Sequence, residues 1–329
     1  MNYSRSTLAV LLGVLLLIVG SASSAENYKG FERGEALISP EELHSKLQRD
    51  NSNLIVLSVS RPHVYRMGHI PESLNVWRGD FNAEVGDPWP YGGMIENRED
   101  FQEFARGLGI DNNSKLVVYS HKYDATRLWW AFHLYGKTDV RVLDGGYQGW
   151  TANGYDVDRV FASEPPERGN FTAEPRRQEL TAQVGDLWRA KNQDDWNLWD
   201  TRSDAEWSGE SVKGNATCAG RVPWSTHVHW SEFKKKVNDD AEQPTAFKNA
   251  SQVRKVAEKY GFDRGQHHIF LCQSGVRTTT EIFSLYLLGY DVEKLHNYDG
   301  SWLGWSYHYC DQETNGRTIP RATVIEAGS

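Results

Sequence analysis

Cys272 stands where a short apolar run gives way to a polar turn. The stretch "IFLCQSGVRTTTEIFSLYLLG" spans residues 269 to 289 and places Arg277 at the end of that turn. Apolar residues at helical spacing follow and stop at Gly289, which predicts a helix that begins directly after Arg277. Residues 268 to 271 are predicted to form a strand, so we expect a strand to deliver Cys272 to the mouth of a helix.

The turn after Cys272 predicts a cradle for a negatively charged sulfur atom. Backbone N–H groups of such a turn point inward at a helix N-terminus, where anions bind. The helix dipole, these N–H groups and Arg277 each favour a thiolate, so we expect the pKa of Cys272 to lie below its free value of about 8.5. The alternative is an inert buried thiol with Arg277 at the surface. The predicted cradle consists of Gln273, Ser274, Gly275, Val276, Arg277 and Thr278.

An internal repeat places this turn in a wider framework. The segment "YGKTDVRVLDGGYQGW" (Tyr135 to Trp150) resembles "LGYDVEKLHNYDGSWLGW" (Leu288 to Trp305). Upstream, the segment from Leu54 to Pro71 parallels the segment from Trp196 to Gly209. Short apolar runs alternate with helical patterns in both halves, including helix-like segments at 39 to 48 and 181 to 191. Alternation of this kind predicts an α/β fold in which each half is a mostly parallel sheet flanked by helices.

In such sheets the working site lies where the carboxyl ends of the strands pass into helices, which is the predicted position of Cys272. A segment rich in Pro and charge separates the halves and is typical of a linker. The predicted organisation is a signal peptide at 1–25, a first domain at 26–159, a linker at 160–180, a second domain at 181–312 and a tail at 313–329.

The start of the chain has the features of an export signal. Arg5 precedes the apolar run from Leu8 to Gly20, and small residues lead to a plausible cleavage site after Ala25. This order is typical of a secretory signal peptide, and the run is short for a membrane span. We expect the protein to be exported, either to the periplasm or as a secreted protein. An uncleaved anchor is the alternative interpretation.

Composition narrows the classes of partner. The chain has 329 residues, 39% of them hydrophobic, and a net charge of −8. This length suits about two domains with separate cores. The negative charge argues against nucleic acid, and against stable association with an anionic membrane surface.

The motifs "CQSGVRT", "DTRSDAEWSG" and, in the first repeat, "GHIP" together resemble the rhodanese family of sulfurtransferases. The resemblance covers nearly the whole mature chain and matches the tandem form of the family, with an inactive first domain and a catalytic second one. It implies that Cys272 takes sulfur from a donor as a persulfide and passes it to a thiophilic acceptor. It also implies that the cradle amides hold this sulfur and that Arg277 helps to bind an anionic donor.

The implied donor is a small anion, thiosulfate or 3-mercaptopyruvate, and the implied acceptor is cyanide or a thiol. A non-enzymatic sulfur carrier or binding module is the alternative. A cysteine-dependent phosphatase or arsenate reductase is disfavoured, because only four residues separate Cys272 from Arg277 and phosphatases of related fold use a longer loop. No metal and no organic cofactor is expected, since the His and Cys residues lack ligand spacing.

Asp200 and Arg202 form an Asp-x-Arg pair that the first repeat replaces with Ser58 and Ser60. We expect Asp200 to support the loop by hydrogen bonding. Arg202 is a candidate for binding the anionic end of the donor through its guanidinium fork. A purely structural pair is the alternative.

The first half contains no cysteine, and its counterpart of Cys272 is Tyr119 or Ser120. Its role is expected to be packing against the second domain. His121, Lys122 and Arg127 are candidates to reach across the cleft, although solvated positions are favoured for all three. In the second half, Arg221 replaces the histidine of "GHIP", and we favour a surface position for it.

The odd number of cysteines leaves at least one thiol without an intramolecular partner in an exported chain. Cys218 and Cys310 could form a disulfide with each other and leave Cys272 free. The rival interpretation is that one of them resolves the persulfide on Cys272.

Overall fold

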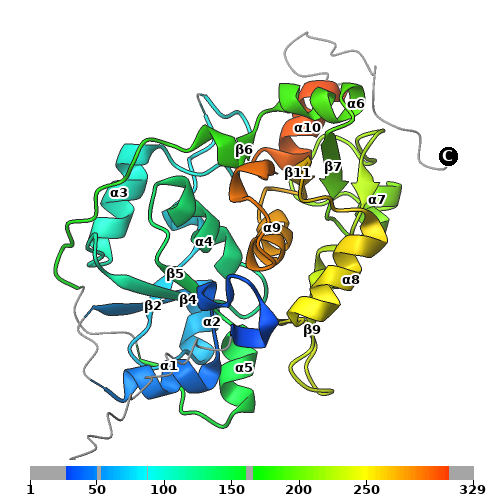
Figure 1. Cartoon of the computed structure of the whole chain (residues 1–329). Coiled ribbons are helices and arrows are strands. Elements are labelled where there is room, and N and C mark those ends of the chain that lie inside the picture. Colours follow the sequence, from blue (N-terminus) through cyan, green and yellow to red (C-terminus); the bar gives the residue numbers. More distant parts are fainter. Residues whose placement is uncertain (1–26, 50–52, 87, 161–165, 311–329) are drawn as a thin grey trace, which may run out of the picture.

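The computed structural model describes residues 27–49, 53–86, 88–160 and 166–310 (Figure 1). The signal peptide predicted at 1–25 and the tail predicted at 313–329 lie outside the described residues. Within the described ranges, no helix combines the length and apolar character needed to cross a membrane.

Two five-stranded sheets, each with only parallel strand pairs, form the framework of the protein. Their strand orders are β1-β5-β4-β2-β3 and β6-β12-β11-β7-β8. The predicted α/β class, with two parallel-sheet domains flanked by helices, is confirmed. The first sheet contains β1 (Leu37–Ile38), β2 (Leu54–Val59), β3 (Leu74–Val76), β4 (Lys115–Tyr119) and β5 (Val140–Leu143). The second contains β6 (Thr181–Ala182), β7 (Trp196–Asp200), β8 (Thr226–His227), β11 (His267–Leu271) and β12 (Leu295–Tyr298).

A small antiparallel ribbon of β9 (Lys234–Lys235) and β10 (Ala246–Phe247) accompanies the second sheet. The helices of the first domain are α1 (Pro40–Leu47), α2 (Pro62–Met67), α3 (Arg98–Gly107), α4 (Ala125–Leu134) and α5 (Gly146–Ala152). Those of the second domain are α6 (Arg189–Asn192), α7 (Asp204–Ser208), α8 (Ala250–Tyr260), α9 (Thr278–Leu287) and α10 (Ser301–Tyr309).

Local sequence explains where several helices begin. Ser39 caps α1 by accepting a hydrogen bond from the backbone of Glu42, and Pro40 occupies the first helical position, as the sequence predicts. The helix-like segment at 181 to 191 is less regular than expected. It contains β6, a 3₁₀ helix (Val184–Trp188) and the start of α6, because the chain first pairs as an edge strand.

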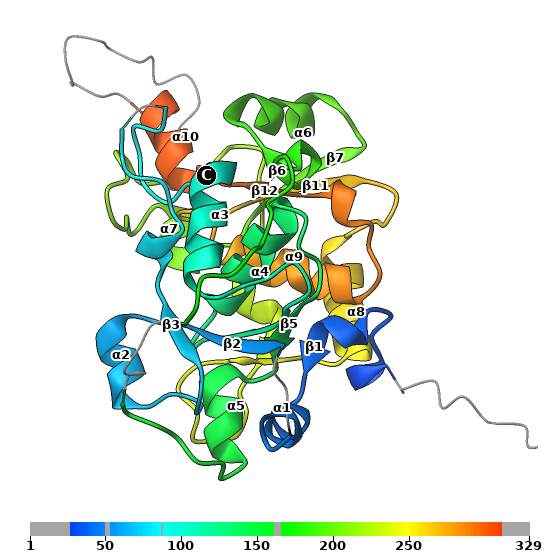
Figure 2. The same cartoon turned by 90° about the vertical axis from the view of Figure 1, so that its left-hand side faces the viewer.

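The two sheets enclose a shared central layer of helices (Figure 2). One large apolar core joins the facing sides of both sheets and includes Leu57, Trp129, Phe270 and Phe283. Smaller cores lie on the outer faces, one under α1 and α5 and one under α10. Burial of apolar surface on both faces of each sheet is what parallel sheets require.

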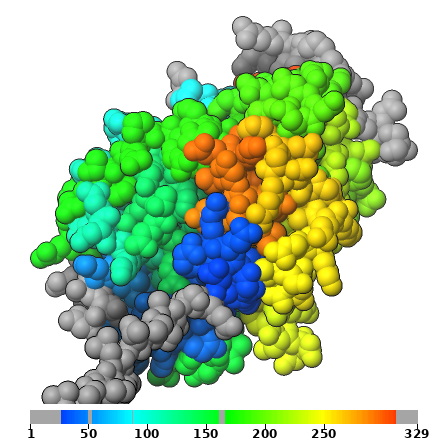
Figure 3. Space-filling view, viewed as in Figure 1, coloured from blue at the N-terminus to red at the C-terminus, as the bar shows by residue number. Residues whose placement is uncertain are grey.

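Two chain segments fasten the domains together. The segment from 27 to 36 leaves the first domain and lies on the second (Figure 3). There, Arg33 donates to the backbone carbonyls of Tyr286 and Tyr290. The described part of the predicted linker lies along the first domain. There, the backbone N–H of Phe171 donates to Ile110 and that of Arg177 donates to Leu134.

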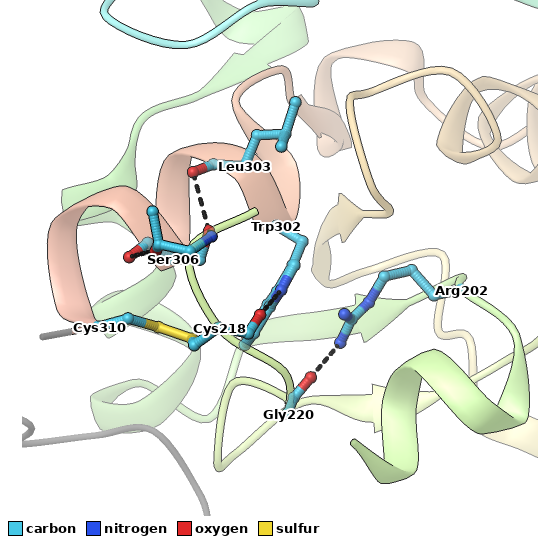
Figure 4. Close-up of a disulfide and its surroundings, with 8 residues drawn as sticks. Arg202, Cys218, Gly220, Trp302, Leu303, Ser306 and Cys310 are labelled. Carbon is cyan, nitrogen blue, oxygen red and sulfur yellow. Dashed lines mark hydrogen bonds between the residues drawn. A yellow bond between two sulfur atoms is a disulfide. The ribbon is translucent and has the colours of Figure 1, made fainter. Parts of the chain in front are cut away.

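Cys218 and Cys310 form a disulfide that joins the loop before β8 to the end of α10 (Figure 4). Their Cα atoms lie 6.1 Å apart, within the usual range for a disulfide. Cys272 is therefore the free cysteine of the chain. The structure therefore contains the predicted disulfide between Cys218 and Cys310, and Cys272 forms no disulfide with either of them.

Replacing both bridged cysteines with serine should lower the free energy of unfolding by about 2–4 kcal/mol, because the bridge restricts a long loop in the unfolded chain. Urea denaturation of the oxidised proteins measures this loss. The matched control is the same comparison in a reducing agent, which opens the bridge of the wild type and should bring the two proteins to similar stability. Equal stability of the double variant and wild type would contradict a stabilising bridge.

Candidate active site

Cys272 lies at the carboxyl end of β11, in the middle of the second sheet. β11 pairs with β7 on one side and β12 on the other, with Leu271 opposite Asp200. The side chain of Cys272 is only 1% exposed. The site is thus built at the end of a central, rigid strand, directly before α9.

The backbone of the turn surrounds the sulfur with N–H donors. Burial acts to raise the pKa of Cys272, but the charge of Arg277 and hydrogen bonds from the backbone N–H groups of Thr278, Ser274 and Arg277 outweigh it, and the pKa lies below its usual value. Thr278 opens α9, so the helix N-terminus also faces the sulfur. The arrangement favours a thiolate.

The hydroxyl of Ser301 holds the turn in shape. Its Oγ accepts hydrogen bonds from the backbone N–H groups of Cys272 (3.1 Å) and Gly275 (2.9 Å) and donates to the carbonyl of Tyr298 (2.8 Å). Ser301 adopts a left-handed backbone with φ of 48°, which is unfavourable for a residue other than glycine. Strained residues of this kind are concentrated at functional sites.

Arg277 is held by a buried carboxylate. Its Nη1 and Nη2 donate to the two oxygens of Glu206 at 2.8 and 2.9 Å, and Glu206 also receives the ammonium of Lys213 at 3.1 Å. These cations lower the pKa of Glu206 although burial acts to raise it. Because Glu206 neutralises one cation, the site carries one surplus positive charge that a thiolate balances. Lys213 is 57% exposed and faces solvent.

The other predicted cradle residues have structural contacts. The side chain of Gln273 donates to the backbone carbonyl of Lys213, which joins the cradle to the loop after α7. Gly275 has a φ of +67°, and a Cβ atom there would lie 2.6 Å from Asp299. Val276 is buried in the second domain, and Ser274 lies against Gly93 of the first domain.

The side chain of Arg127, from the first domain, contacts the backbone of the cradle in the second domain. It is fully buried, and its Nη1 donates to the carbonyl of Gly275 (2.9 Å) and pairs with Asp299 (2.5 Å). Its Nη2 donates to the carbonyl of Gly93. The favoured solvated position for Arg127 is therefore wrong, because helix α4 carries this side chain into the interface between the domains.

Asp200 and Arg202 form a closed pair beside the cradle. The guanidinium of Arg202 contacts both oxygens of Asp200 and lies over the ring of Trp302. It also donates to the carbonyl of Gly220 (Figure 4). The backbone N–H of Arg202 also donates to Asp200. The structure thus places Arg202 in the interior with structural partners and does not bring its fork to the cradle. This arrangement corresponds to the structural alternative for the pair.

The first domain repeats the architecture without the thiol. Tyr119 pairs with Ser58 as Leu271 pairs with Asp200, so the residue that follows, Ser120, is the counterpart of Cys272. Lys122 is exposed, as expected, whereas His121 is half-buried and stacks on Tyr147. In the second domain, the guanidinium of Arg221 lies 4.2 Å from the ring of Trp207.

Four residues of the site have no role in the expectations drawn from sequence: Glu206, Lys213, Ser301 and Asp299. Glu206 carries a usable signal, since Ser203 and Glu206 have the spacing of a helix capping box, and the structure contains that box. Ser301 and Asp299 lie in the repeated Asp-Gly segment, but their contacts with the cradle depend on tertiary structure.

Comparison with known proteins identifies the family. A family model described as "Rhodanese-like domain" matches this chain twice, at residues 39–153 and 183–308. Among curated proteins, the chain is 29% identical over 291 residues to the sulfur carrier protein TtuD of Thermus thermophilus, covering 84% of this chain and 95% of the relative. It is 30% identical over 219 residues to a Haloferax volcanii protein provisionally named as a thiosulfate sulfurtransferase, covering 64% of this chain and 72% of the relative.

Among solved structures, the fold resembles the anaerobic ergothioneine biosynthesis enzyme from Chlorobium limicola in complex with trimethyl histidine. The TM-score is 0.70 at 22% identity, covering 88% of this chain and 71% of the other. At this level of identity the likeness establishes a shared fold.

Ser301→Ala should slow the reaction of the Cys272 thiolate with a small thiol-specific reagent by about tenfold, equivalent to about 1.4 kcal/mol, because two buried N–H groups of the turn lose their acceptor. Ser301→Gly should be similarly slow although glycine relieves the backbone strain. The matched control is Ser306→Ala, a buried serine on the same helix. Wild-type rates in Ser301→Gly would show that the hydroxyl is dispensable.

Proposed function

The chain belongs to the rhodanese family, and on this basis we propose that it is a sulfurtransferase that carries sulfane sulfur on Cys272. The observation that supports this most directly is a free, buried cysteine with a lowered pKa, surrounded by the N–H groups of Ser274, Arg277 and Thr278. The relatives named as a sulfur carrier and as a thiosulfate sulfurtransferase support the same chemistry.

In the proposed reaction, the Cys272 thiolate attacks the outer sulfur of a small anionic donor. With thiosulfate, a new S–S bond forms to Cys272 while the bond to the sulfonate breaks, and sulfite leaves with the electron pair. With 3-mercaptopyruvate, the thiolate attacks the one sulfur atom of the donor and the carbon–sulfur bond breaks; pyruvate enolate leaves with the electron pair and takes up a proton to become pyruvate. Cyanide or a thiolate then attacks the outer sulfur of the persulfide, and Cys272 leaves as a thiolate.

The side chains around Cys272 suit these charges. The N–H groups that stabilise the thiolate also suit the negatively charged outer sulfur of the persulfide. Lys213 and Arg277 supply positive charge for an anionic donor and for departing sulfite. Glu206 holds both cations and compensates for one of them, so the site favours a donor of modest charge.

A non-catalytic sulfur carrier is the second candidate, supported by the relative named as a sulfur carrier protein, which the chain covers over 95% of its length. In that case the persulfide forms but passes only to a dedicated protein partner.

Incubation of the protein with thiosulfate or 3-mercaptopyruvate should add one sulfur atom to the wild type, as measured by intact mass, and none to Cys272→Ser. The double variant Cys218→Ser with Cys310→Ser is the matched control and should load normally. Subsequent addition of cyanide should release thiocyanate over many turnovers. A persulfide that neither cyanide nor small thiols discharge would favour the carrier, and absence of loading with both donors would overturn sulfur transfer at Cys272.

We also propose that the protein is exported, to the periplasm or as a secreted protein. The charged start, the apolar run from Leu8 to Gly20 and the small residues before Ala25 support this, and the Cys218–Cys310 disulfide suits an oxidising compartment.

Expression in a host that exports its own proteins should give a mature chain that begins at Glu26, as measured by N-terminal sequencing of the exported fraction. Replacing Leu12 and Leu15 with arginine should hold the chain inside the cell, since a charged centre blocks signal function. An intracellular, full-length wild-type chain would contradict export.

A further inference from the structure

The first domain keeps a small cavity at its own counterpart of the catalytic turn. Ser120, the counterpart of Cys272, lines this cavity together with Thr126 at the start of α4. Lys234 and Thr245 from the second domain close it from the opposite side. The cavity therefore lies between the two domains, at the N-terminus of a ten-residue helix.

Lys234 supplies an uncompensated charge to this cavity. Its side chain is 6% exposed, and no described residue forms a hydrogen bond or an ion pair with its ammonium group. The ammonium lies 3.2 Å from the centroid of the Phe247 ring. Burial lowers the pKa of Lys234 to about 7, opposed in part by Asp144. A buried cation that no anionic group pairs with directly is costly, and a bound anion would relieve that cost.

The nearby carboxylates already have partners. Asp144 accepts the backbone N–H of Phe247 at 2.8 Å and the hydroxyl of Tyr28, and it pairs with Lys29. Asp124, at the end of the turn, pairs with Arg78. The remaining ionisable residues that line the cavity are Lys122 and Tyr123, and neither carries a carboxylate. The cavity is thus electropositive.

We propose that this cavity binds one small monovalent inorganic anion, of the size of chloride or hydrosulfide, between Lys234 and the N-terminus of α4. The cavity offers about 10 Å³ to the centre of a small occupant, so it has room for one such ion and excludes thiosulfate. The bound ion joins a second-domain lysine to a first-domain helix, so it stabilises the contact between the domains. The inference does not depend on sulfur transfer at Cys272.

Thermal unfolding of the full chain tests the site, with chloride replacing gluconate at constant ionic strength. The expected result is a rise in Tm on the order of 2 °C, because a ligand that binds only the folded state stabilises it. The rise should be larger at pH 6 than at pH 8, since the ammonium form of Lys234 binds the anion. Lys234→Met should lose the chloride effect, and Lys235→Met, an exposed neighbour on β9, should keep it.

A crystal soaked in bromide provides a measurement that needs no variant. Anomalous scattering from bromide in contact with the Lys234 ammonium supports the site. Bromide only at surface positions, or a chloride effect of equal size in Lys234→Met and wild type, would overturn it. Hydrosulfide in place of chloride shows whether the site also takes the sulfur-containing ion.

Discussion

The guanidinium of Arg127 has no access to solvent, and the positions of both domains depend on how it is satisfied. A buried charge is costly unless carboxylate and carbonyl oxygens surround it. Asp299 and the carbonyls of Gly275 and Gly93 provide such oxygens to its Nη1 and Nη2 atoms. Because Gly275 belongs to the cradle and Gly93 to the first domain, both domains determine the shape of one turn. A domain without a cysteine therefore takes part in building the site for Cys272.

The cradle buries Cys272 and balances the negative charge of its thiolate. Cys272 is nearly inaccessible, and its thiolate is stabilised mainly by groups that cannot move away, the backbone N–H groups and a guanidinium locked to Glu206. Ser301 adds a fixed acceptor at the cost of backbone strain. Such preorganised dipoles need little rearrangement when sulfur chemistry changes the charge on the cysteine. The site is rigid because its supporting contacts come from several elements.

The spacing of apolar residues in the sequence predicts the elements that carry the site, since the apolar runs of β11 and α9 are typical of a buried strand and a buried helix. The same patterns locate Cys272 and the turn up to Thr278. They do not predict Arg127 and Asp299 as partners, because these residues are 172 positions apart and a lone arginine in a polar turn normally faces water. The role of Ser301 cannot be predicted from the sequence for another reason. Its role depends on a left-handed backbone, which the glycine at the equivalent position of the first domain, Gly146, adopts without strain.

The contact between α4 and α9 has the form of a symmetric dimer within one chain. The hydroxyls of Thr126 and Thr279, each the second residue of its helix, meet at 2.9 Å. Asp144 accepts the N–H of Phe247, and its counterpart Asp299 accepts that of Ile95. In a true homodimer every substitution occurs twice, so an arginine beside the axis would face its own copy. Fusion of the halves removes that constraint, and one half can hold Arg127 while the other holds Thr280.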